Sequence, residues 1–233
     1  MDKEIAVLMA AGMGTRMRPL TERIPKPLVK VKGIPMIESV INALKVRNID
    51  EIYVVTGYLG EQFSCLKEKY PGIRLIENRE YETVNNISSV KAAAGVLSGR
   101  DAFICEADLY IPDPAVFDTE LEGSCYFGKF VAGHSDDWVF DLDEKGIITR
   151  VGKVGDDRYN MCGIARFCAE DSELIAKAVC DRYLKPGFED LFWDDVVNEN
   201  LDRLKLTVHP VERDEIVEID SLEELKAIDP CYE

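Results

Sequence analysis

A short segment near the start of the chain combines glycines with positively charged side chains. Gly12 and Gly14 are followed by Arg16 and Arg18, and Lys26 lies further on between two prolines. Glycine lets a backbone approach a ligand closely, and successive N–H groups in such a loop form a concavity that suits phosphate oxygens. Cations beside that concavity would neutralise the phosphates. The segment therefore predicts a binding site for a nucleoside triphosphate.

The loop differs from two common phosphate-binding loops. It lacks the G-x-x-x-x-G-K-[ST] pattern of a Walker A loop, and Arg18 stands where a dinucleotide fingerprint has its third glycine. Gly-x-Gly by itself is also common in plain tight turns. The longer string Gly-x-Gly-Thr-Arg-x-Arg-Pro-Leu-Thr, followed by Pro-Lys-Pro-Leu, is more specific. It resembles the signature of the sugar-phosphate nucleotidyltransferases, the pyrophosphorylase superfamily.

This resemblance implies roles for single residues around the loop. The implied nucleotide contacts are Leu8, Ala10, Ala11, Gly12, Gly14 and Thr15. Lys26 and Arg16 are the implied catalytic cations. The prolines beside Lys26 hold the backbone extended, and a lysine directed at a triphosphate can neutralise charge on the α-phosphate and the leaving pyrophosphate. A surface lysine would need no such framing.

Two aspartates at the ends of apolar segments are candidate ligands for Mg²⁺. Asp108 follows residues 102–105 and Asp220 follows residues 217–219. Proteins usually hold Mg²⁺ with one or two carboxylates, together with phosphate oxygens and waters. Either aspartate alone could equally be a turn or helix-capping residue. Both match aspartate segments of the nucleotidyltransferases, and this resemblance implies that both bind the metal.

Paired amides are candidates for recognition of the base. Asn85, Asn86 and Ser88 lie in a polar segment, where nucleotidyltransferases of this kind contact the base. Amide donors and acceptors suit the N4, N3 and O2 edge of cytosine. The alternative is that Asn86 or Ser88 simply caps the helix that follows.

Aromatic and acidic side chains are candidates for the acceptor side. Trp138 is one of two tryptophans, and the other, Trp193, lies in the segment Phe192-Trp193-Asp194-Asp195. Aromatic faces beside carboxylates are typical of a site for a quaternary ammonium ion, although ordinary core packing is the alternative. With the Asn-Asn pair, these segments resemble the bacterial CTP:phosphocholine cytidylyltransferases from residue 5 to about residue 228.

The second resemblance implies a particular reaction and acceptor site. The reaction is Mg²⁺-dependent conversion of CTP and phosphocholine into CDP-choline and pyrophosphate. The implied acceptor contacts are Trp138, Phe192, Trp193, Asp194 and Glu218. Two departures affect the acceptor pocket: Glu106-Ala107-Asp108-Leu109 replaces Asp-Ala-Asp-Asn, and Phe192 stands where a tyrosine can occur. The alternatives are a sugar-1-phosphate nucleotidyltransferase that uses another nucleotide and a non-catalytic nucleotide-binding domain.

Composition restricts the remaining classes of function. The 233 residues are 46% hydrophobic, enough for a sizeable core, and their formal net charge is −16. This charge argues against nucleic acid or an anionic membrane as a partner, because both bind basic surfaces. No apolar run is long enough to span a membrane. The seven cysteines are scattered and form no C-x-x-C pair. This pattern favours reduced thiols over disulfides, so we expect a cytoplasmic protein.

The first half of the chain alternates apolar strands with amphipathic helices. Strands are predicted at residues 5–8, 52–55, 73–76 and 102–105, and helices at residues 35–44, 61–70 and 87–97. This order favours a parallel sheet with helices on both faces, in which ligands bind at the carboxyl ends of the strands. The glycine loop, the Asn85 loop and Asp108 all follow predicted strands, so we expect them at one edge of the sheet.

The second half is less regular. Strands are predicted at residues 125–131, 138–142, 147–151, 160–167, 206–208 and 216–219, and helices at residues 172–183 and 192–200. Residues 143–146 predict a hairpin turn, and Ser221 with Glu224 predicts a capping box for a last helix. With the resemblance, this order predicts one α/β domain over residues 1–233. Its fold is a Rossmann-like nucleotidyltransferase, with a mixed, mostly parallel sheet flanked by helices and a small β-hairpin substrate portion. The domain could belong to a longer protein, for instance one that includes a choline kinase.

Overall fold

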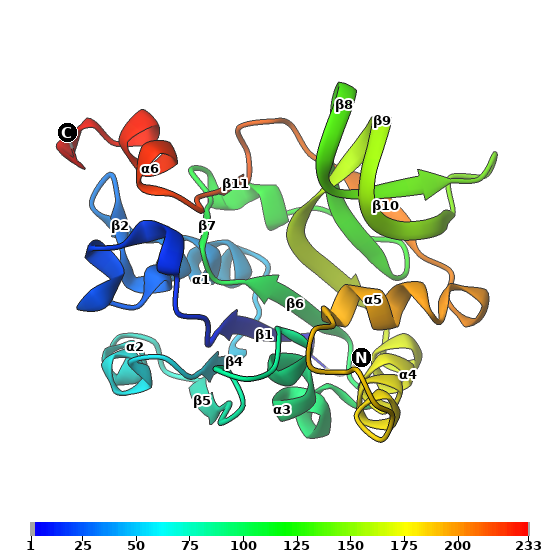
Figure 1. The fold of residues 1–233 in the computed structure, drawn as a ribbon, viewed down its shortest axis with the longest axis horizontal. Helices are drawn as coiled ribbons and strands as arrows, with labels where there is room; N and C mark the ends of the chain where they lie inside the picture. Colours follow the sequence, from blue (N-terminus) through cyan, green and yellow to red (C-terminus); the bar gives the residue numbers. More distant parts are fainter. Residues whose placement is uncertain (1–2, 233) are drawn as a thin grey trace.

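The centre of the fold is a mixed seven-stranded sheet. The computed structural model describes residues 3–232, and its strands follow the order β10-β8-β9-β6-β1-β4-β5 (Figure 1). Their bounds are β1 Ile5–Ala10, β4 Glu51–Thr56, β5 Ile73–Glu77, β6 Ala102–Glu106, β8 Cys125–Leu142, β9 Ile148–Phe167 and β10 Thr207–Pro210. β1 is parallel to β4 and β6, whereas β9 is antiparallel to β6 and β8. The predicted mixed α/β sheet is therefore confirmed.

Helices cover both faces of this sheet. The helices are α1 Met36–Val46, α2 Ser64–Lys69, α3 Ile87–Leu97, α4 Ala169–Arg182, α5 Trp193–Asn198 and α6 Leu222–Ile228. One core packs α1 and α2 against the sheet, and a second core packs α3, α4 and α5 against the other face (Figure 1). Among the described residues, no helix has the length and apolar character to cross a membrane.

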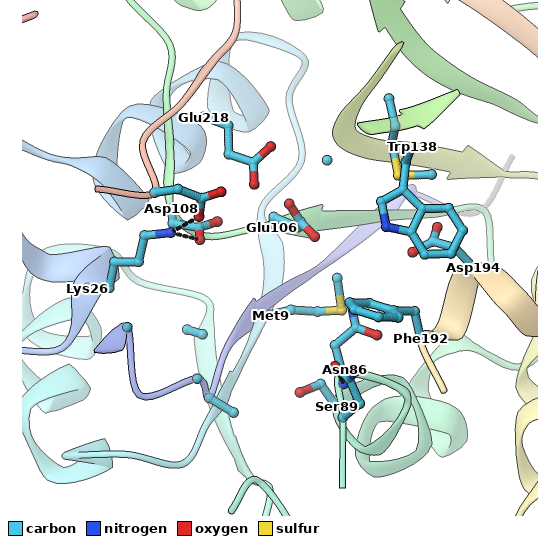
Figure 2. Close-up of a pocket in the computed structure, with 18 of the residues that line it drawn as sticks. Met9, Lys26, Asn86, Ser89, Glu106, Asp108, Trp138, Phe192, Asp194 and Glu218 are labelled. Atoms are coloured by element: carbon cyan, nitrogen blue, oxygen red, sulfur yellow. Dashed lines mark hydrogen bonds and ion pairs between the residues drawn. The ribbon is translucent and has the colours of Figure 1, made fainter. Parts of the chain in front are cut away.

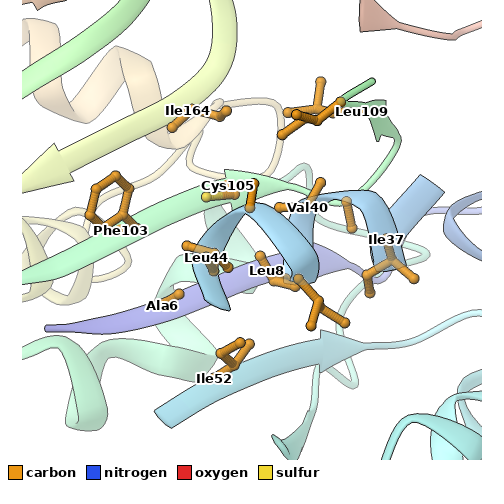
Figure 3. Packing of buried hydrophobic residues seen from close by; sticks show 14 of the residues in the cluster. Ala6, Leu8, Ile37, Val40, Leu44, Ile52, Phe103, Cys105, Leu109 and Ile164 are labelled. Atoms are coloured by element: carbon orange, nitrogen blue, oxygen red, sulfur yellow. The ribbon is translucent and has the colours of Figure 1, made fainter. Parts of the chain in front are cut away.

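The alternation of side chains along β1 explains why both faces are covered. Ala6 and Leu8 point into the core under α1, while Ile5 and Val7 point into the core under α3. Successive side chains of a strand point to opposite faces, so a strand that is apolar throughout must be buried on both. In Figure 3, Leu8 lies beneath α1 close to Leu44. This burial fixes β1 and therefore the loop that leaves its carboxyl end.

Two short strands join distant parts of the chain beside β6. β7 Leu109–Tyr110 pairs antiparallel with β11 Val217–Glu218, and the N–H of Ile219 donates to the carbonyl of Asp108 over 3.3 Å. The predicted capping box of α6 is confirmed, since Ser221 accepts from the N–H of Glu224. This pairing carries Asp220 to the carboxyl end of β6. A separate two-stranded sheet, β2 Lys30–Val31 and β3 Ile34–Pro35, precedes α1.

The β8–β9 hairpin is longer than the sequence predicts. Residues 125–131 and 138–142 belong to one strand, β8. Residues 148–151 and 160–167 are joined in β9, and Ile147 lies just before it. The register shifts repeatedly along the pair of strands, so the hydrogen-bond ladder is irregular. The regular alternation of apolar residues is therefore interrupted, and the sequence predicts separate short strands. The predicted turn is present, because the carboxylate of Asp143 accepts from the N–H groups of Lys145 and Ile147.

Candidate active site

A cleft of about 580 Å³ lies at the carboxyl ends of β1 and β6 (Figure 2). Its walls are the glycine loop, the start of α3, the β8–β9 hairpin, the segment before α5 and the segment around β11. The predicted residues that line it are Ala10, Ala11, Gly12, Gly14, Thr15, Arg16, Lys26, Asn85, Asn86, Ser88, Asp108, Trp138, Phe192, Asp194, Glu218 and Asp220. The sheet thus brings both halves of the predicted site into one cavity.

Two predicted residues do not line the cleft. Leu8 is fully buried under α1, so its side chain belongs to the core. Trp193 is 3% exposed and stacks on Tyr126 with ring centroids 5.9 Å apart. Of the two interpretations of Trp193, core packing is therefore correct. The assignment of Trp193 to the acceptor is corrected because the first turn of α5 directs it inward, away from the cleft that Phe192 reaches.

The glycine loop allows a close approach to Lys26. Gly14 has φ +58°, and a Cβ there would lie 2.8 Å from Cβ of Lys26. Glycine adopts this left-handed backbone without a steric cost. The carbonyl of Gly14 also accepts a hydrogen bond from the hydroxyl of Thr21 over 2.8 Å. Gly12, in contrast, faces open space in the cleft, where a phosphate would have room to approach the backbone.

Lys26 is buried between two carboxylates. Its Nζ atom donates to Asp108 over 2.5 Å and to Asp220 over 2.6 Å, and the residue is 6% exposed (Figure 2). Burial opposes the positive charge, but the two carboxylates outweigh it and raise the pKa of Lys26. Arg16 also contacts Asp220 over 2.8 Å, although its side chain is 70% exposed. The cation is therefore permanently charged and held at one position.

Three carboxylates converge at this end of the cleft. Oxygen atoms of Asp108, Glu218 and Asp220 lie within 4.8 Å of one another. Glu218, predicted on the acceptor side, thus lies beside the two predicted metal ligands. Glu218 is exposed at the cleft, but partial desolvation by the cleft walls and the charges of Asp108 and Asp220 raise its pKa to about 8. Oxygen donors of this kind fit a hydrated Mg²⁺ ion.

The predicted base-binding amides hold the neighbouring backbone. Oδ1 of Asn86 accepts from the N–H of Trp193 over 3.0 Å, and Oδ1 of Asn85 accepts from the N–H of Asn86 over 2.7 Å. Asn86 precedes α3 but its side chain makes no capping hydrogen bond. Ser88 is buried and accepts from Nδ2 of Asn78 over 2.8 Å. The pocket floor is therefore a hydrogen-bonded unit, and Asn78 is a member that the sequence analysis missed.

The acceptor side combines two rings with a buried carboxyl group. Trp138 and Phe192 meet edge to face, with centroids 5.4 Å apart and an interplanar angle of 68°. Asp194 lies beside them and is 2% exposed (Figure 2). Burial raises the pKa of Asp194 to about 7, and its carboxyl group accepts from the hydroxyl of Tyr126 over 3.0 Å. Rings and carboxyl group together suit a cationic group.

Several residues of the cleft were not predicted from the sequence as site residues. They include Met9, Asn78, Ser89, Glu106, Lys129, Lys153, Asn160 and Met161. Most lie on strands, where alternation alone does not distinguish a cleft wall from a core or solvent face. Only Glu106 could have been found from the sequence, because it stands where the related enzymes have the first aspartate of Asp-Ala-Asp-Asn. Nothing in the sequence pattern distinguishes Lys153 from the other lysines of the hairpin.

Residues 6–137 match the family described as the MobA-like NTP transferase domain, which fits the nucleotidyltransferase class that the sheet and glycine loop define. The chain is 52% identical over 231 residues to the 2-aminoethylphosphonate cytidylyltransferase of Lancefieldella rimae, covering 99% of this chain and 94% of that protein. It is 34% identical to the choline-phosphate cytidylyltransferase of Streptococcus pneumoniae, covering 96% of each. The chain therefore belongs to the cytidylyltransferases of the NTP transferase family.

A solved structure supports the same relationship. The CTP:phosphocholine cytidylyltransferase from Streptococcus pneumoniae matches with a TM-score of 0.89 and 32% identity, covering 99% of this chain and 100% of the other. The predicted nucleotidyltransferase fold and cytidylyltransferase class are thus confirmed. The relative at 52% identity is named for a phosphonate acceptor, so phosphocholine stays a prediction.

Proposed function

We propose that the chain transfers a cytidylyl group from CTP to 2-aminoethylphosphonate and releases pyrophosphate. The observation that carries the reaction type is Lys26, held between Asp108 and Asp220 beside the glycine loop. The 52% identity to a 2-aminoethylphosphonate cytidylyltransferase supports this acceptor. The buried carboxyl group of Asp194 also suits its ammonium group.

The reaction needs little covalent chemistry from the protein. An oxygen of the acceptor phosphonate attacks the α-phosphorus of CTP, and the bond from that phosphorus to pyrophosphate breaks. Lys26 and Arg16 would neutralise the charge that develops on the phosphate oxygens. The two carboxylate partners of Lys26 hold its ammonium group in place beside the glycine loop. Catalysis then depends mainly on position and charge.

We further propose that the site uses Mg²⁺. Asp108 and Asp220, with Glu218, would hold the ion, because their oxygens converge and Mg²⁺ prefers carboxylate and phosphate ligands. When bound, the ion would add positive charge beside the phosphates. Recognition of cytosine is assigned to the unit that includes Asn85, Asn86 and Ser88, which lines the cleft and in which Nδ2 of Asn86 has no hydrogen-bond partner among the described residues.

Phosphocholine is the second candidate acceptor. The edge-to-face pair of Trp138 and Phe192 favours it, since aromatic faces attract quaternary ammonium ions. Both candidates combine a cation with an anionic phosphorus group, so they would occupy the cleft in the same direction. They differ in the methyl groups on nitrogen and in the oxygen that links phosphorus to carbon.

A pyrophosphate-release screen tests the proposal. The purified chain is assayed with CTP, UTP, GTP and ATP, each against 2-aminoethylphosphonate, phosphoethanolamine, phosphocholine and glucose 1-phosphate. We expect the highest kcat/KM for CTP with 2-aminoethylphosphonate. A preference for glucose 1-phosphate would favour a sugar-nucleotide enzyme instead, and the absence of turnover with every pair would favour a binding domain.

A further inference from the structure

The aromatic pair of the acceptor site already holds a cation of the chain itself. Nζ of Lys153 lies 4.9 Å from the ring centroid of Phe192 and 5.6 Å from that of Trp138. Both distances are within the range of an attractive cation–π contact. Lys153 and Trp138 are also direct partners across the β8–β9 hairpin. The two residues are therefore placed together by the register of the strands.

The backbone of Lys153 is restrained while its side chain reaches into the cleft. Its carbonyl accepts a hydrogen bond from Nη1 of Arg150 over 3.2 Å. Arg150 is in turn paired with Asp141 over 2.6 Å, so the strand is braced at this point. In the part of the chain that the structure describes, no carboxylate forms an ion pair with Lys153. The rings are thus its stabilising contact.

A trimethylammonium group would compete with Lys153 for the same faces. Such a group cannot donate hydrogen bonds, so it depends on aromatic faces and on general negative charge. To bind against Phe192 and Trp138, it would have to displace the Lys153 ammonium or share the site with a like charge. Either event weakens the binding of a choline headgroup.

A primary ammonium group has another place to bind. Glu106 lies between the Asp108–Glu218 cluster and the aromatic pair (Figure 2), and no donor of the described residues forms a hydrogen bond to its carboxyl group. Gly163 makes room for it, since a Cβ at Gly163 would lie 2.7 Å from Oε2 of Glu106. Ammonium hydrogens can donate to Glu106, or to Asp194, and leave Lys153 in place.

We propose that Lys153 determines acceptor specificity: by occupying the Trp138–Phe192 pair, it selects acceptors with a primary ammonium group over those with a trimethylammonium group. This inference rests on the proposed function and names the residue that separates its two candidate acceptors. Glu106 supplies the hydrogen-bond acceptor that a primary ammonium group needs.

The decisive comparison uses phosphoethanolamine and phosphocholine, because these acceptors differ only in the methyl groups on nitrogen. We expect Lys153→Met to raise the kcat/KM of phosphocholine relative to phosphoethanolamine by roughly two- to fivefold, the scale of one cation–π contact at an exposed site. Lys153→Arg keeps a cation over the rings and should leave the ratio near that of the wild type. Lys145→Met, on the exposed hairpin turn, is the matched control and should also leave it unchanged.

An unchanged ratio of the two kcat/KM values in Lys153→Met would overturn the inference. If both kcat/KM values also fell by the same factor, Lys153 would instead be a phosphate contact. Absence of turnover by the wild type with every amine-bearing acceptor would instead contradict the proposed function. A binding assay covers that case. Tetramethylammonium is titrated against tryptophan fluorescence, and Lys153→Met should bind it several-fold more tightly than the wild type. If Lys153→Met does not fold, Lys153→Gln serves in both assays, and equal binding to variant and wild type contradicts the inference.

Discussion

The nucleotide end and the acceptor end of the cleft are built in different ways. At the nucleotide end, the glycine loop and Lys26 come from one segment that follows a largely buried strand. At the acceptor end, Trp138 comes from an irregular antiparallel hairpin, and Phe192 and Asp194 come from the start of a short helix. The first arrangement depends on a contiguous motif. The second depends on how distant elements pack.

The two ends also differ in how their charges are balanced. Lys26 has two carboxylate partners at 2.6 Å or less, so charge at the nucleotide end is paired within the protein. Asp194 and Glu106 at the acceptor end have no cationic side chain in hydrogen-bond contact among the described residues. The nucleotide end is thus preorganised for chemistry, whereas the acceptor end holds two carboxyl groups whose pKa values burial raises and which would gain from the arrival of a cationic ligand. Variants at the nucleotide end should therefore mainly lower kcat, whereas variants at the acceptor end should mainly change KM for the acceptor.

The largest expected effect comes from the metal site. We expect activity to be lost in excess EDTA and restored by Mg²⁺, and Asp108→Asn and Asp220→Asn to be inactive, because a hydrated ion needs both carboxylates. Pyrophosphate release measures activity, and circular dichroism verifies the fold. Undiminished turnover in EDTA would show that the nucleotide end works without a metal.

The next effect concerns Lys26. Lys26→Met should lower kcat by roughly 10²–10³, the usual loss when one preorganised charge-stabilising donor is removed. Steady-state kinetics with saturating CTP would measure this. Thermal unfolding is the control, because the change also leaves Asp108 and Asp220 without their buried partner. A near wild-type rate would exclude Lys26 from the mechanism.

A smaller effect distinguishes the two tryptophans. Trp138→Ala should raise KM for phosphocholine by roughly tenfold and leave KM for CTP nearly unchanged, because its ring lines the cleft beside Phe192 at the acceptor end. Trp193→Phe is the matched variant. It should lower the free energy of unfolding through looser packing against Tyr126, with little change in either KM. If Trp138→Ala changed only the KM for CTP, the assignment of Trp138 to the acceptor end of the cleft would be wrong.

The last expected effect is a pH dependence of stability, which is measured apart from catalysis. Burial raises the pKa of Asp194 to about 7, whereas an unfolded aspartate ionises near pH 4. Between these values the native state keeps a proton that the unfolded state loses, so this group lowers stability as pH rises. Asp194→Asn should therefore gain stability relative to the wild type between pH 5 and pH 7, on the order of 1 kcal/mol per pH unit, and the gain should level off above pH 7. Denaturant unfolding at several pH values measures it, and parallel pH profiles would contradict the burial of an ionisable group.

The sequence by itself determined the nucleotide end. Gly12, Gly14 and Lys26 are close in the chain, and the apolar run before them predicts a buried strand whose carboxyl end must carry the loop. Local patterns of this kind are reliable because few backbone conformations satisfy them. The alternation of strands and helices likewise determined the sheet. These elements follow from hydrophobic periodicity, which needs no knowledge of distant contacts.

Tertiary structure alone decided the carboxylate cluster and the arrangement of the acceptor end. The pairing of β7 with β11 brings Glu218 to Asp108, although the two residues are far apart in sequence. The turn of α5 decides that Phe192 reaches the cleft while Trp193 enters the core, and both residues look alike in the sequence. The register of β8 with β9 sets Lys153 over Trp138. A shift of one residue would direct either side chain to the opposite face, and no local pattern determines that register.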